Sequence, residues 1–297
     1  MKKPYYKYLF ALLLFGSNGI VASHISLTSY EIVFLRTMIG SFLLLTIFLF
    51  TRGRFTFWQY KQQFLFLSIS SIAMGASWMF LYEAYRQIGV SIASLAYYCG
   101  PVIVMVLSPL LFREKLTWPK IVGFLTVIFG IVLVNRQVFQ AGKTGWGLLC
   151  GGMSAVMYAF MVIFSKKTKD ITGLENSTLQ LVISFSTVAI FVGFRQGFVI
   201  RASGGNVIWI LILGLLNTGI GCYFYFSSIG YLPVQTVAIC GYLEPLSAIV
   251  LSAVILHETM STRQICGIAM VIGGAIIGES ISFKKVQSIA CQIIDKK

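Results

Sequence analysis

Two ionisable side chains lie inside long apolar stretches of the sequence: Glu244 near the middle of one stretch, and Arg36 about two helical turns from the end of another. A charge so far from water is costly and persists only where it is paired or wetted. An acid there can bind a substrate ammonium or take up a proton, because desolvation favours the neutral carboxyl. An arginine there can hold a carboxylate through two parallel hydrogen bonds. If both lie in one cavity, they suit an amino acid.

Both residues also have a structural interpretation. A protonated Glu244 can hydrogen-bond to a neighbouring helix or to backbone left unpaired by Pro245, which has no N–H. Arg36 can pair with Glu31 near the same helix end or with Glu83. From the sequence, these alternatives stay open beside the substrate-binding ones.

Polar and aromatic side chains at mid-stretch positions complete a candidate cavity. Amphipathic rings with a polar tip suit pockets for mixed metabolites, but Tyr and Trp also gather at membrane interfaces, and Asn often bridges helices. By their depth in the apolar stretches, the predicted substrate-binding residues are Asn18, Arg36, Trp78, Tyr82, Tyr98 and Glu244.

The composition identifies the elements that must position these residues. Of the 297 residues, 57% are hydrophobic and 11% are charged, whereas soluble domains carry about 25% charged residues. So few ionised side chains cannot cover a chain in water, and the sequence therefore predicts an integral membrane protein. The net charge of +14 would suggest nucleic acid as the partner of a soluble chain, but here the lipid bilayer is the expected partner and nucleic acid is not.

Ten apolar stretches have roughly the length needed to cross a hydrocarbon core of ~30 Å as helices. They lie at about 6–23, 29–51, 63–85, 89–112, 118–135, 146–165, 174–194, 206–228, 231–256 and 262–281. A transmembrane barrel would show alternating segments of about ten residues, which the sequence lacks. The predicted fold is all-α, with ten transmembrane helices.

Basic residues predict the orientation, because Lys and Arg accumulate in cytoplasmic loops. With the N-terminus inside, 16 of the 23 Lys and Arg residues fall in cytoplasmic segments, six fall in outer loops, and Arg36 lies within a span. Ten spans then place both termini in the cytoplasm.

An internal repeat divides the chain. A shift of 144 residues superposes Tyr98 on Tyr242 and Pro101 on Pro245, and the register holds through four consecutive spans. Five spans per unit make the second unit enter the membrane from the opposite side. The sequence therefore predicts two inverted five-helix repeats, 1–140 and 141–281, followed by a basic cytoplasmic tail, 282–297. Inverted repeats usually place a substrate site near the midplane and work by alternating access.

A second group of residues is assigned to gating or to structure. Pro101 and Pro245 interrupt the backbone hydrogen bonding of a span, so that gates and static bends are both possible. Glu114 and Glu258 are repeat partners at helix ends, which favours capping or tethering of a loop. Cysteines and histidines show no metal-binding spacing, so that neither a metal nor a cofactor is predicted.

These features together resemble the drug/metabolite transporter superfamily, specifically its EamA-type members. The resemblance covers about residues 6–281 and is carried by Arg36, by the stretches 93–101 and 113–117, and by 242–246 with His257-Glu258. It implies a small-molecule carrier of the inner membrane, usually an exporter of amino acids, related metabolites or drug-like compounds. One departure is Phe15-Gly16, where the family often has Trp-Gly.

No nucleotide-binding or hydrolase motif appears in a supporting context, so the sequence predicts no enzyme and no ATP-driven pump. The expected activity is secondary transport of a small metabolite, most simply export, with H⁺ as a possible coupling ion and a homodimer as a possible assembly. An importer, a non-transporting membrane protein and a membrane-embedded enzyme remain as alternatives.

Overall fold

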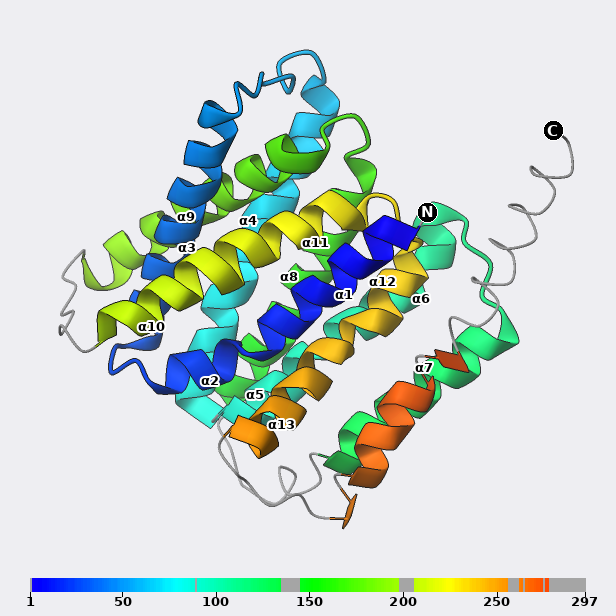
Figure 1. Ribbon diagram of the computed structural model, residues 1–297. Helices are drawn as coiled ribbons and strands as arrows, with labels where there is room; N and C mark the ends of the chain where they lie inside the picture. The colour runs from blue at the N-terminus through cyan, green and yellow to red at the C-terminus, as the bar shows by residue number, and fades with distance from the viewer. Residues whose placement is uncertain are drawn as a thin grey trace, which may run out of the picture.

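The computed structural model describes residues 2–88, 90–134, 145–197, 206–255, 262–263, 265–274 and 276–277. Within these ranges every regular element is a helix (Figure 1). The described helices fit the predicted fold of ten transmembrane helices in two inverted five-helix repeats. Three predicted features lie outside the described residues: the boundary near residue 140, the side chain of Glu258, and the basic tail 282–297.

The helices follow the predicted spans in order. The first half contains α1 (Lys2–Gly16), α2 (Asn18–Ser23), α3 (Ser29–Phe50), α4 (Lys61–Ile88), α5 (Val90–Tyr97), α6 (Gly100–Phe112) and α7 (Trp118–Val134). The second half contains α8 (Gly145–Lys167), α9 (Gly173–Gln196), α10 (Val207–Leu211), the π-helix η3 (Ile212–Ile220), α11 (Gly221–Ile229), α12 (Val234–Gly241) and α13 (Leu243–Ile255). The tenth span is described as an apolar helix over Ile265–Gly274.

Several spans are not the continuous helices that the apolar pattern suggests. The first span breaks at Ser17, the fourth at Tyr98 and Cys99, and the ninth at Tyr242. The last two breaks lie one repeat apart. Each is followed by a proline in the first turn of the next helix, where the missing N–H leaves no intrahelical bond unmade. Pro101 and Pro245 therefore start α6 and α13 rather than bend a continuous helix.

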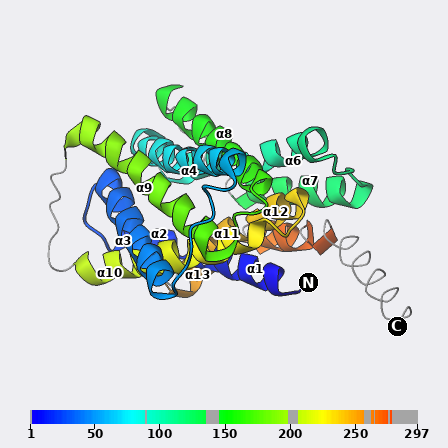
Figure 2. The ribbon, with the colours of Figure 1, turned by 90° about the horizontal axis from the view of Figure 1, so that it is seen from above.

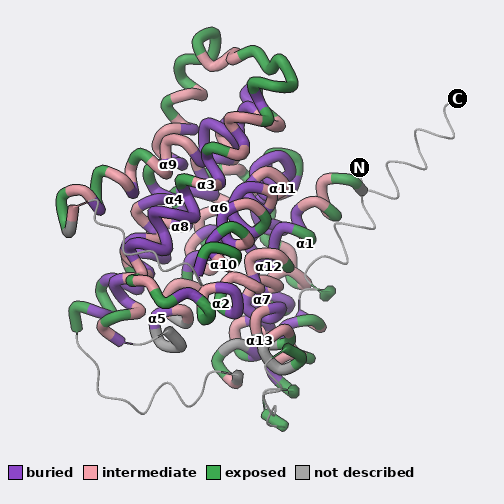
Figure 3. Tube along the Cα trace, turned by 60° about the vertical axis from the view of Figure 1, so that its left-hand side comes forward, coloured by how far each residue is buried: buried purple, intermediate pink, exposed green. Residues whose placement is uncertain are grey.

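The helices at the centre of the bundle are buried, and its ends and periphery are exposed (Figure 3). Helix α4 packs against α8 and α9, and α1 packs against α11 and α13. The end of the bundle where α2 finishes and α3 begins, opposite the N-terminus, is called the distal end below (Figure 1).

Helix α7 and the helix over 265–274 lie side by side at one edge (Figures 1 and 2). A Cβ added to Gly130 would lie 2.7 Å from the carbonyl oxygen of Gly267, and one added to Gly274 would lie 2.5 Å from that of Gly123. Gly123 and Gly130 are the repeat partners of Gly267 and Gly274. The two halves therefore meet here through reciprocal glycine contacts, which permit close helix packing.

Two acids near helix starts have structural roles. Glu31 forms a capping box with Thr28 at the start of α3. Its repeat partner, Glu175, instead accepts hydrogen bonds from the backbone N–H groups of Thr56 and Phe57, at 2.6 Å and 3.0 Å. Glu175 thereby ties the loop after α3 to the start of α9.

Candidate substrate-binding site

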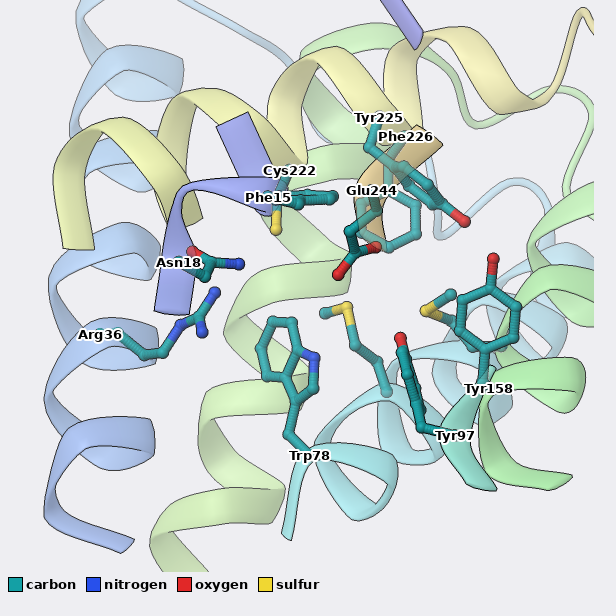
Figure 4. A pocket seen from close by; sticks show the side chains of 12 residues that line it. Phe15, Asn18, Arg36, Trp78, Tyr97, Tyr158, Cys222, Tyr225, Phe226 and Glu244 are labelled. Atoms are coloured by element: carbon teal, nitrogen blue, oxygen red, sulfur yellow. The ribbon is translucent and has the colours of Figure 1, made fainter. Parts of the chain in front are cut away.

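A cavity in the middle of the bundle brings together four of the six predicted substrate-binding residues. Asn18, Arg36, Trp78 and Glu244 line it, and it contains about 430 Å³ of empty space, some of it continuous with the outside (Figure 4). The other lining residues are aromatic or sulfur-containing: Phe15, Met74, Tyr97, Tyr158, Met161, Cys222, Tyr225 and Phe226.

Arg36 is fixed by two neighbours that are not acids. Its Nε donates a 2.9 Å hydrogen bond to Thr218 Oγ1, and its guanidinium carbon lies 4.9 Å from the centre of the Trp78 ring. A cation over an indole face is attracted by the ring quadrupole. In the part of the chain that the structure describes, Arg36 forms no ion pair with Glu31 or Glu83, the predicted partners. No described residue accepts a hydrogen bond from the terminal nitrogens of Arg36, so they could bind a ligand.

Glu244 lies in the first turn of α13, and its carboxylate points into the cavity (Figure 4). A negative charge near a helix N-terminus is favoured by the helix dipole. Among the described residues, no side chain or backbone N–H donates a hydrogen bond to this carboxylate, and no cation lies within ion-pair distance of it. The cavity thus presents a carboxylate that no neighbouring group in this part of the chain neutralises.

Aromatic rings form the wall between Glu244 and the end of the bundle that contains the N-terminus. Tyr97 and Tyr158 meet edge to face, with ring centroids 5.4 Å apart, and their hydroxyl groups point toward the cavity (Figure 4). In the described ranges, no three His, Cys, Asp or Glu side chains come close enough to hold a metal ion. The described lining therefore offers one cation, one carboxylate, and mainly aromatic walls that also carry the Asn18 amide and tyrosine hydroxyl groups.

The π-helix η3 positions the cation side of the cavity. Thr218 accepts from Arg36 while its own hydroxyl donates to the carbonyl oxygen of Leu213, 2.8 Å away. π-Helical turns are rare and often occur at functional sites. Thr218 is a contact that the sequence analysis missed. The 144-residue shift places the polar Thr218 opposite the apolar Met74, and this difference between the two repeats is a signal that could have found it.

The neighbouring η3 residue, Asn217, holds the break in the first span. Its Nδ2, which carries two N–H groups, lies within hydrogen-bond distance of three acceptors: the carbonyl oxygen of Leu14, Ser17 Oγ and Asn18 Oδ1, at 3.0 Å, 2.8 Å and 3.0 Å. The short π segment therefore fixes both Asn18 and Arg36, which come from different helices.

Tyr82 and Tyr98 do not line this cavity. The Tyr82 ring packs against Tyr85, with centroids 5.1 Å apart. The Tyr98 ring packs against Tyr97 at 5.7 Å, and its backbone carbonyl accepts a hydrogen bond from Tyr242. Their predicted contact with substrate remains a prediction.

Glu114 caps a half-helix of the other repeat. Its carboxylate accepts hydrogen bonds from the backbone N–H groups of Val234 and Gln235, at 2.8 Å and 3.1 Å, at the start of α12. On the other side of the same turn, Lys166 Nζ donates to the carbonyl oxygens of Ile229, Gly230 and Leu232. The negative charge of Glu114 thus lies at the N-terminal end of α12, and the positive charge of Lys166 lies at the C-terminal end of α11. Each charge is favoured by the dipole of the helix that it contacts.

A second cavity lies beside this turn, toward the N-terminal end of the bundle. It contains about 800 Å³ of empty space and is lined partly by Glu114, Lys166 and Tyr231. Phe226 lines both this cavity and the central one. The side chain of Phe226 is buried, so it stands between the two spaces.

Comparison with known proteins agrees with this architecture. The EamA-like transporter family matches the chain twice, over residues 4–136 and 145–278. The uncharacterized transporter YxxF of Bacillus subtilis is 26% identical over 271 residues, which cover 90% of this chain and 86% of the relative. An uncharacterized transporter of Archaeoglobus fulgidus is 23% identical over 266 residues, covering 89% of this chain and 92% of the relative.

A protein of known crystal structure superposes with a TM-score of 0.80 over 93% of this chain and 97% of its own, at 17% sequence identity. At that identity the likeness shows the fold alone. The two family matches span nearly the whole chain, one for each five-helix repeat. The chain therefore belongs to the EamA-like transporter family, within the drug/metabolite transporter superfamily, and is a multi-pass membrane transporter.

Proposed function

We propose that the protein is a secondary transporter that exports an amino acid or a related small metabolite across the inner membrane by alternating access. The observation that carries this proposal is the shared cavity of Arg36 and Glu244, in which neither side chain has an ion-pair partner among the described residues. A buried charge without a partner is costly. A zwitterionic substrate would neutralise both charges at once.

The substrate's two charges have distinct positions in this cavity. Its carboxylate would bind the terminal nitrogens of Arg36 beside Asn18, and its ammonium would bind Glu244 among Tyr97, Tyr158 and Tyr225. The intervening apolar and aromatic surface suits the rest of the molecule. Without substrate, a proton on Glu244 would neutralise the acid, which would make H⁺ the coupling ion.

The two cavities support alternating access. The central cavity and the cavity beside the α11–α12 turn are separated by Phe226, so that a small movement of α11 would connect them. The excess of basic residues at the N-terminal end favours a cytoplasmic location for both termini and for the second cavity. Substrate would enter there, reach Arg36 and Glu244, and leave at the distal end.

Counterflow in proteoliposomes tests the function. Vesicles containing the full chain are loaded with one unlabelled solute from a panel of amino acids and related metabolites, and uptake of the same labelled solute is followed. The expected result is saturable exchange of one or a few zwitterionic solutes, and net flux under imposed gradients then distinguishes export from import. If no solute shows saturable exchange, the carrier function is wrong, and a non-transporting membrane protein or a membrane-embedded enzyme becomes the better account.

A further inference from the structure

A groove distinct from both cavities described above lies between α4, α8 and α9 at the distal end of the bundle. It contains about 850 Å³ of empty space and is lined by residues of four helices: Tyr30, Ala76, Met79, Phe80, Glu83, Trp146, Cys150, Thr187, Phe191 and Arg195. It shares no lining residue with the central cavity, so it is not part of the proposed transport site.

The lining changes from apolar to charged along the helix axes. On α4, Ala76 and Glu83 are seven residues apart, and on α9, Thr187 and Arg195 are eight apart. At 1.5 Å per residue these intervals correspond to about 10–12 Å. The groove therefore runs from the apolar interior of the membrane to its surface, with its charged residues at the surface end.

The charged end carries a net positive charge. Glu83 accepts a hydrogen bond from the Tyr30 hydroxyl and one from Gln87 Nε2 at 3.1 Å, and Arg86 lies 3.8 Å away. The exposed Arg195, in contrast, has no carboxylate within ion-pair distance among the described residues. Arg86 and Arg195 thus lie beside one acid, Glu83, whose carboxylate already has hydrogen-bond and ion-pair partners.

We propose that this groove binds a phospholipid with an anionic headgroup, whose phosphate lies at Arg195 and one of whose acyl chains lies along α4 and α9. The groove faces the hydrocarbon region, where an unfilled apolar channel loses its dispersion contacts. Arginine binds phosphate through parallel hydrogen bonds. The positive charge selects an anionic lipid over a neutral one.

Trp146 lines the groove and is 57% exposed, so it can report the occupant through its fluorescence. The full chain is reconstituted in two kinds of phosphatidylcholine vesicle. In one, a fixed fraction of the lipid is phosphatidylglycerol with brominated acyl chains; in the other, the same fraction is phosphatidylcholine with brominated acyl chains. Bromine quenches indole fluorescence at contact. Because the chain has five tryptophans, the Trp146 signal is taken as the difference between the wild type and Trp146→Phe.

The proposal predicts at least twofold stronger quenching of Trp146 by the brominated anionic lipid than by the brominated neutral lipid at the same mole fraction. Arg195→Gln should abolish this preference, and Arg195→Lys should retain most of it. The matched control is Arg54→Gln, an exposed arginine at the opposite end, which should leave the preference unchanged.

Equal quenching by the two lipids in the wild type would overturn the proposal, as would an unchanged preference in a folded Arg195→Gln protein. Ala76→Leu gives a second test that leaves the charges in place. A larger side chain in the inner part of the groove should reduce quenching by both lipids, and full quenching in this variant would contradict the position of the acyl chain. Quenching does not depend on transport. The quenching test can therefore contradict the lipid site without contradicting the proposed transport function, and the counterflow test can contradict transport without contradicting the lipid site.

Discussion

The hydroxyl group of Tyr242 donates a 2.9 Å hydrogen bond to the backbone carbonyl oxygen of Tyr98, and the two tyrosines are equivalent positions of the 144-residue repeat. Each lies at the break of its span, between α5 and α6 in one half and between α12 and α13 in the other. The bond satisfies a carbonyl at a helix end, where intrahelical partners are missing. It joins the two broken helices at the centre of the molecule.

Removing this bond should destabilise the protein without altering the cavity lining. Tyr242→Phe should lower the free energy of unfolding by about 0.5–1.5 kcal/mol, because the partly buried hydrogen bond to the Tyr98 carbonyl is lost. Thermal unfolding in detergent measures the effect. Tyr98→Phe is the matched control, since the Tyr98 hydroxyl has no hydrogen-bond partner among the described residues. Equal destabilisation by the two variants would contradict this role for Tyr242.

The glycine contact between α7 and the last helix makes a second prediction about stability. Gly130→Ala should lower the melting temperature, because the added methyl group meets the Gly267 backbone and overpacking costs about 1–3 kcal/mol. Gly273→Ala lies on the same pair of helices, and its Cβ would meet nothing within 4 Å. That control should be neutral or slightly stabilising. A Gly130→Ala protein as stable as Gly273→Ala would show that the two helices pack differently.

The bond from Arg36 to Thr218 predicts a defect in substrate affinity. Thr218→Val keeps the shape and removes the acceptor, and hydrogen bonds to charged groups contribute about 1.5–3 kcal/mol. The apparent KM for counterflow should therefore rise by about 10-fold or more, while Thr218→Ser should restore it. If Val and Ser variants have the same KM, Thr218 does not position Arg36 for substrate.

Phe226 should control access between the two cavities. In a protein whose single cysteine is Cys222, a central-cavity residue that is 1% exposed, Phe226→Leu should accelerate labelling by an impermeant thiol reagent added at the N-terminal end. Phe224→Leu is the control on the same helix, because Phe224 packs against Phe10 rather than between the cavities. Equal labelling rates in the two variants would show that Phe226 does not control access between the two cavities.

The fold was largely predictable because lipid imposes simple requirements on a sequence. Spans must be long and apolar, and the 144-residue register exposed the two halves directly. The breaks at Tyr98 and Tyr242 were less visible. Pro101 and Pro245 indicate an interruption, but proline position alone does not distinguish a bend in a helix from the start of a new one.

Four residues that line the central cavity could be predicted from the sequence: Arg36 and Glu244 by their charge and depth, and Asn18 and Trp78 by their depth. Depth does not reveal which way a side chain points, so depth alone indicates Tyr82 and Tyr98 although neither lines the cavity. The sequence also did not reveal that Thr218 is the hydrogen-bond partner of Arg36. The sequence suggested Glu31 or Glu83, whereas Glu31 caps α3 and Glu83 binds Tyr30, Gln87 and Arg86.

In the proposed transport cycle, Glu244 binds the charged end of the transported solute. The most direct test is counterflow of the solute identified by the panel, measured for the wild type, Glu244→Gln and Asp170→Asn at several pH values. Asp170 is an exposed loop acid, so Asp170→Asn should retain wild-type exchange and its pH dependence. Glu244→Gln should lose at least 10-fold in exchange rate, and its remaining flux should not vary with pH. A folded Glu244→Gln protein with wild-type exchange and wild-type pH dependence would contradict the account.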